Sequence, residues 1–263
     1  MYALIHGLLA DRGSAAPFTC FGPWHIRTII GAAVIAALVL LLTKNGSRAR
    51  EKAASVFTHI AFGLYIADFF LMPFAYEQID MEKLPFHVCT AMCVMCFLSR
   101  HVRFLEKYRA NFALLGFVSN LVYLIYPAGV MWYRVDPLCY RVVQTLTFHA
   151  MMTVGCLLTL VADGEGLSAK SCRRDLAVLA GMTLWAVLGN ALYNGAAGSY
   201  DHRFNWFFVT GDPFGILDRS IAPYVMPFLN IAIFFAAELL VRAVLQLLRP
   251  RSAHGSGTEQ KKA

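Results

Sequence analysis

The chain has 263 residues, of which 58% are hydrophobic and 15% charged, and its mean hydropathy is +0.56. Soluble domains carry about 25% charged residues, so this composition excludes an ordinary soluble protein and also a soluble domain with a single anchor. The formal net charge is +7, but the basic residues fall between apolar segments rather than in one block, which argues against nucleic-acid binding.

About seven apolar segments approach the length of roughly 20 residues that crosses a bilayer as a helix. The third is short for a span, and no remaining segment is long enough for a soluble domain. We therefore predict an all-α, polytopic membrane protein with a single integral membrane domain, residues 1–248, and a basic disordered cytoplasmic tail, residues 249–263. No basic segment precedes the N-terminal apolar run, so we expect no cleaved signal peptide. The predicted spans are 26–43, 54–76, 84–99, 110–127, 142–162, 175–195 and 221–248.

The basic residues predict the orientation of these helices. They concentrate in alternate connections, at 44–52, 100–109 and 170–174, and again after the last span. The positive-inside rule then places the N-terminus outside and the C-terminus in the cytoplasm, in agreement with an odd number of spans. We expect a multi-pass protein of the cell membrane with no nucleic-acid partner, and the sequence does not indicate its oligomeric state.

Polar side chains gather in the predicted outer half of the helices. At about 1.5 Å per residue, six helices bring them to a similar depth. Such residues usually face a bundle interior or a wet cavity, so we predict a polar cavity in the outer half. For each amide the alternative stays open that it only hydrogen-bonds a neighbouring helix. The residues expected to line the cavity and bind substrate include Asp68, His87, Asn120, Gln144, Asn190 and Asn194.

The stretch FHVCTAMCVMC contains one histidine and three cysteines inside an apolar segment. Cys89, Cys93 and Cys96 share one helix face, and buried cysteines usually pack as small hydrophobes, which we expect of Cys93 and Cys96. His87 lies about 200° around the helix from Cys89, so a base for this thiol must come from another helix. His149 has the matching depth, and a Cys89–His149 pair would form a nucleophile for acyl transfer.

Other readings of the same residues stay open. Two histidines and a cysteine could bind zinc or copper, but no HExxH or CxxC motif is present, so we expect no metal and no cofactor. A bundle with a polar cluster also suits a small-solute transporter, although the chain has no internal repeat. A non-catalytic membrane protein that binds a lipid or a metal is a third alternative. Cys20 and Cys139 both fall outside and could form a disulfide.

The segment HRFNWFFVTGDPFGILDRSIAPY, between the last two predicted spans, mixes aromatic and charged residues. It is too short and too polar to span a bilayer, and aromatic residues concentrate at membrane interfaces. We expect an interfacial or re-entrant lid over the polar cavity, and an ordinary amphipathic connector is the alternative.

Several short patterns occur in a fixed order along the chain. They are LPFHVC at 84–89, Gln144 and His149 on a downstream helix, NALYN at 190–194, and NWFF…DP…ILD…APY from Asn205 to Tyr224. In this order and spacing the chain resembles the YwaF-like integral membrane proteins over about residues 80–230. Animal relatives of that family resemble phospholipid acyltransferases that use an intramembrane cysteine.

The resemblance implies roles for individual residues. Cys89 would be the nucleophile and His149 its partner, while Asn205 and Asp218 would be substrate-binding positions of the outer loop, and a membrane lipid would be the substrate. The chain departs from the family pattern at Trp206, where a tyrosine is usual, and at 222–224, where a Gly-Pro-Trp-Pro-like turn is usual.

Overall fold

The computed structural model describes residues 2–10, 13–44, 46–75, 81–131, 134–164, 168–196, 204–213 and 215–248. Within these ranges the protein is all-α and has no β-strand, so the predicted fold class is confirmed. The predicted tail, 249–263, lies outside the described residues. The helices are α1 (Tyr2–Leu9), α2 (Pro23–Leu42), α3 (Ser47–Ala75), α4 (Val88–Leu98), α5 (Arg103–Glu106), α6 (Arg109–Ile125), α7 (Ala128–Met131), α8 (Tyr140–Asp163), α9 (Ala169–Ala196) and α10 (Ala222–Leu248), with 3₁₀ turns at Met81–Lys83 and Trp206–Phe208.

Six helical stretches of the described part are long and apolar enough to cross a membrane, namely α2, α3, α6 together with α7 (Arg109–Met131), α8, α9 and α10. Their ends follow local signals. Pro23 begins α2, where its missing N–H leaves no helical hydrogen bond unmade. Gly164 ends α8 in the left-handed conformation, with φ of 73°, which glycine adopts without a steric penalty. The prediction of a polytopic membrane protein is therefore confirmed.

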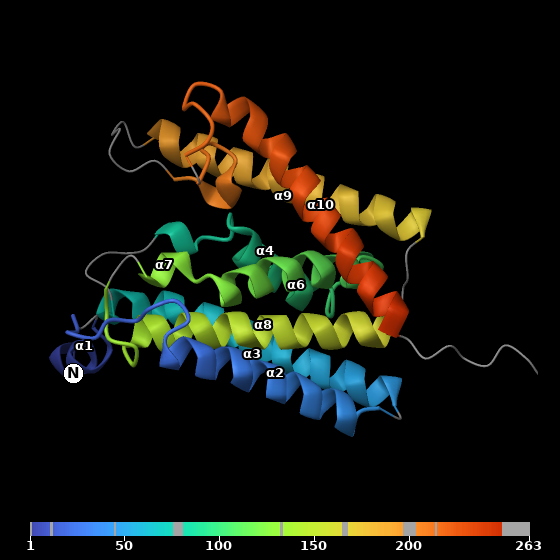
Figure 1. Cartoon of the computed structure of the whole chain (residues 1–263), viewed down its shortest axis with the longest axis horizontal. Helices are drawn as coiled ribbons and strands as arrows, with labels where there is room; N and C mark the ends of the chain where they lie inside the picture. The colour runs from blue at the N-terminus through green and yellow to red at the C-terminus, as the bar shows by residue number, and fades with distance from the viewer. Residues whose placement is uncertain are drawn as a thin grey trace, which may run out of the picture.

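The helices pack in three groups, which Figure 1 shows from top to bottom. The first group is the pair α9 and α10, the second is α4 and α6, and the third is α2, α3 and α8. Helix α8 packs against α2, α3 and α6, and most of its side chains are buried. The main hydrophobic core lies where α4, α6, α8 and α9 meet and includes Cys93, Leu114, Met152 and Leu179.

The third predicted span, 84–99, differs from the structure. Helix α4 covers only Val88–Leu98 and is about 16 Å long, roughly half of a hydrocarbon core. Residues 84–87, directly before it, are not helical. Lys83 forms an ion pair with Asp68, and Arg100 forms one with Glu51 at 2.6 Å. Because Asp68 and Glu51 lie about 25 Å apart along α3, the segment between Lys83 and Arg100 traverses most of the bundle.

Candidate functional site

The Cys89 thiol lies in the first turn of α4. Cys89 is half-buried, whereas Cys93 and Cys96 are buried in the main core together with Cys156. The thiol of Cys89 faces the hydroxyl of Ser119 on α6, which also donates to the carbonyl of Gly116 at 3.3 Å. The expectation that Cys93 and Cys96 pack as hydrophobic residues is confirmed, and Cys89 packs against the same core but is only partly buried.

The His149 ring is held rigidly on α8. Its Nδ1 donates to the carbonyl of Thr145 at 2.7 Å, and the ring stacks on Tyr123 with 3.8 Å between centroids. Since a carbonyl oxygen only accepts, Nδ1 carries the proton and Nε2 of the neutral ring is an acceptor. His87 and Lys83 lie close enough to His149 to interact with it electrostatically. Among the described contacts there is no hydrogen bond between His149 and Cys89, so their pairing stays a prediction.

Asp68 holds the segment that leads into α4. Its carboxylate accepts hydrogen bonds from the ammonium of Lys83 and from the hydroxyl of Tyr140, the latter at 3.0 Å. The hydroxyl of Tyr65 donates to the carbonyl of Lys83 at 3.1 Å. These bonds tie α3, α8 and the residues just before His87 together. Asp68 therefore helps to position His87 and Cys89.

Two of the predicted cavity amides, Asn190 and Asn194, and the predicted loop residue Asn205 hold the loop between α9 and α10. Asn190 exchanges two hydrogen bonds with the backbone of Trp206, both 3.0 Å long. Asn194 does the same with Phe204, at 2.9 and 2.7 Å. The side-chain oxygen of Asn205 accepts from the backbone N–H of Thr210 at 3.0 Å. Together they fold residues 204–213 onto the bundle and bury the side chain of Trp206.

The remaining predicted site residues lie in different surroundings. Asn120 is fully buried, and its Nδ2 donates to the carbonyl of Gly116 at 2.8 Å, while its Oδ1 has no partner among the described residues. Gln144 is half-buried and accepts from the hydroxyl of Thr145 at 3.2 Å. Asp218 is exposed in the turn before α10, where hydrogen bonds from Ser220 lower the pKa of its carboxyl. The exposed position of Asp218 favours a role in beginning α10.

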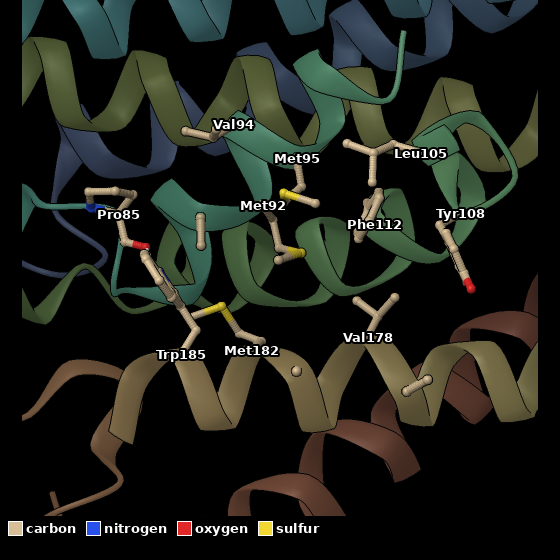
Figure 2. A pocket seen from close by; sticks show the side chains of 13 residues that line it. Pro85, Met92, Val94, Met95, Leu105, Tyr108, Phe112, Val178, Met182 and Trp185 are labelled. Carbon is tan, nitrogen blue, oxygen red and sulfur yellow. Dashed lines mark hydrogen bonds between the residues drawn. The ribbon is translucent and has the colours of Figure 1, made fainter. Parts of the chain in front are cut away.

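An apolar cavity of about 540 Å³ lies between α4, α6 and α9. Figure 2 shows Met92 and Met95 of α4 facing Met182 and Val178 of α9 across it. Trp185 and Pro85 lie at one end of the cavity and Tyr108 at the other. The cavity is lined by Pro85, Ala91, Met92, Val94, Met95, Leu105, Tyr108, Phe112, Ala177, Val178, Gly181, Met182 and Trp185.

The sequence matches the TMEM164 family over residues 20–247. The chain belongs to the TMEM164 family. The matched range covers every candidate site residue and all membrane-spanning helices except the last residue of α10. Searches of curated proteins and of solved structures returned no match.

In this TMEM164-family protein the structure brings several residues to the site that the sequence did not identify. Lys83 and Tyr140 bind Asp68, Ser119 faces Cys89, and Tyr123 stacks on His149. Tyrosine and serine are common in membrane helices, so the sequence alone does not indicate that these side chains belong to the site. Lys83 is likewise recognised only by its ion pair with Asp68 in the structure. Within the described ranges no group of three or more histidine, cysteine or acidic side chains could hold a metal ion. Neither Cys20 nor Cys139 is part of a disulfide.

Proposed function

We propose that this TMEM164-family protein transfers an acyl chain between membrane lipids through a thioester on Cys89. One observation carries the proposal: of the three cysteines on α4, Cys89 alone lies in the first helical turn and is only partly buried. Cys93 and Cys96, deeper in the helix, lack both features. A thiol in apolar surroundings becomes a nucleophilic thiolate only when a base beside it takes its proton.

His149 is the proposed base. Its Nδ1–H bond to Thr145 and its stack on Tyr123 leave Nε2 oriented as an acceptor. In the first half-reaction the thiol proton passes to Nε2 of His149, and Sγ attacks the ester carbonyl of a donor lipid. The ester C–O bond breaks, the thioester forms, and the lysolipid oxygen takes the proton from His149. In the second half-reaction the hydroxyl of another lysolipid gives its proton to His149 and attacks the thioester carbonyl. The C–S bond breaks, and Sγ of Cys89 takes the proton back from His149.

The loop held by Asn190 and Asn194 supports the same chemistry. It places Trp206 and Phe207 over the bundle, and both side chains are almost fully buried. Trp206 lies close to the segment that leads into α4, because its indole N–H donates to the carbonyl of Glu82 at 3.2 Å. A thioester hydrolyses if water reaches it, and a buried aromatic cover excludes water from a reactive intermediate. The cover therefore favours transfer to a lipid hydroxyl over hydrolysis.

The test is acyl exchange in liposomes that contain the purified full-length protein, an isotope-labelled phospholipid donor and a lysophospholipid acceptor. Cys89→Ser should abolish exchange, whereas Cys93→Ser, the matched control one turn further along α4, should retain it. His149→Ala should also abolish exchange, and the double variant of Cys89 and His149 should be no worse than either single variant, as for residues that act as a unit. Undiminished exchange by Cys89→Ser would refute the proposal.

A further inference from the structure

Polar or aromatic contacts join the helices on either side of the cavity between α4, α6 and α9. At the end near Cys89 the indole N–H of Trp185 donates to the carbonyl of Pro85 at 2.6 Å, and the Phe86 ring stacks on Trp185 with 4.9 Å between centroids. At the other end of the helices Asp175 of α9 accepts from Asn111 of α6 at 2.6 Å. The contacts hold α9 at a fixed spacing from α4 and α6 and leave the apolar space between them.

We propose that this cavity binds one acyl chain of a membrane lipid. The binding of a chain is independent of the proposed transfer at Cys89, because it rests on the cavity itself. Its volume of about 540 Å³ lies within the range of roughly 300–1,000 Å³ typical of ligand sites. Its walls are apolar, and Met92, Met95 and Met182 supply flexible thioethers that adapt to a chain without a fixed shape.

The dimensions favour an acyl chain over a partner helix. Between Ala177 and Trp185 the cavity follows α9 for about 12 Å, at about 1.5 Å per residue. A volume of about 540 Å³ over that length leaves a smaller cross-section than a helix needs, since a helix with side chains is about 10–12 Å wide. A single hydrocarbon chain is thinner and enters from the surrounding bilayer, where such chains are the solvent.

The cavity lies on a different face of α4 from the proposed nucleophile. Ala91, Val94 and Met95, which line it, lie roughly 140–240° around the helix from Cys89. The thiol of Cys89 faces Ser119 of α6 instead. A chain bound in the cavity is therefore held apart from the thiol, and the two proposals can be tested separately.

Gly181 keeps the cavity open. It lines the cavity from α9, and a Cβ atom built there meets no atom within 4 Å. A leucine at this position would extend into the cavity without displacing the helix. Gly63 of α3 is the matched control, because it is also helical and exposed, has no atom within 4 Å of a built Cβ, and does not line the cavity. Both substitutions raise helix propensity by a similar amount.

The experiment uses the full-length protein in nanodiscs that contain a phosphatidylcholine with a diazirine in its sn-2 acyl chain. After irradiation, cross-links in the wild type should concentrate on peptides that contain Met92, Met95 and Met182. Gly181→Leu should lower this labelling several-fold and Gly63→Leu should leave it unchanged. Cys89→Ala should abolish acyl exchange and retain the labelling.

The outcomes separate the two proposals. Labelling of the cavity peptides together with undiminished exchange by Cys89→Ala would support the chain site and refute the proposed function. Labelling spread evenly over the lipid-facing helices of the wild type would overturn the inference, whatever the activity of the Cys89 variant. Equal labelling of Gly181→Leu and Gly63→Leu, with both proteins monodisperse, would overturn it as well.

Discussion

The buried ion pair between α9 and α10 allows a quantitative prediction of stability. Arg242 donates from Nε to Oδ2 of Asp175 at 2.6 Å and from Nη2 to Oδ1 at 2.7 Å, and both residues are at least 98% buried. Asn111 of α6 donates to the same carboxylate. This network joins three helices at the end of the bundle opposite to Cys89. Glu238, one turn before Arg242, is buried too, and neither of its carboxylate oxygens has a hydrogen-bond partner among the described residues.

Arg242→Gln leaves the Asp175 carboxylate in a medium of low dielectric without its cation. Breaking a buried pair by removing one partner costs about 3–5 kcal/mol, since the remaining charge is uncompensated. For a chain of this size such a loss lowers the melting temperature by roughly 10 °C. The double variant Asp175→Asn with Arg242→Gln removes both charges and should regain part of the loss. Glu238→Gln replaces a buried carboxyl group that accepts no hydrogen bond from the described residues, so it should not destabilise the protein.

The assay is the thermal stability of the detergent-purified variants, followed by the loss of the monodisperse peak in size-exclusion chromatography. Measuring Asp175→Asn alone completes a double-mutant cycle and isolates the coupling between the two residues. A melting temperature of Arg242→Gln equal to that of the wild type would refute the reasoning. So would a Glu238→Gln variant that is destabilised as much as Arg242→Gln.

Three further predictions concern the loop, the segment before α4 and the orientation. Asn190→Ala removes two hydrogen bonds to the loop backbone and leaves buried groups unpaired, so it should cost about 1–3 kcal/mol per group and increase protease cleavage within 204–213; unchanged cleavage would contradict this. Gly189→Ala places a Cβ atom where it would clash with the Phe86 ring, so it should lower stability and acyl exchange more than Gly63→Ala, and equal effects would contradict the close packing. Lys107→Cys should resist an impermeant thiol reagent on intact cells, and ready labelling would reverse the predicted orientation.

The helices were predictable wherever length and apolarity determine the structure. Helices α8 and α10 lie within a few residues of the predicted spans, because only a continuous helix satisfies its own backbone in lipid. The third span shows the limit of this rule. An apolar run does not reveal whether the chain is helical, and the residues before Val88 are instead held by the contacts of Asp68 and Lys83. Those contacts join residues far apart in the sequence.

The candidate site was predictable in depth but not in partners. Helical rise gives the depth of Asn190 and Asn194, but their hydrogen bonds go to the backbone of the loop, which no periodicity indicates. The rigid setting of His149 depends on Tyr123 of another helix. The apolar cavity was not predictable either, since Met92 and Met182 read as ordinary lipid-facing or core residues until the position of α9 is known.

The most direct test of the central claim is mass spectrometry of the full-length protein after incubation with a phospholipid donor and no acceptor. The account predicts an acyl adduct on the peptide that contains Cys89, released by neutral hydroxylamine as a thioester, absent from Cys89→Ser and present in Cys93→Ser. No adduct on Cys89, or equal acylation of Cys89 and Cys172, would contradict it.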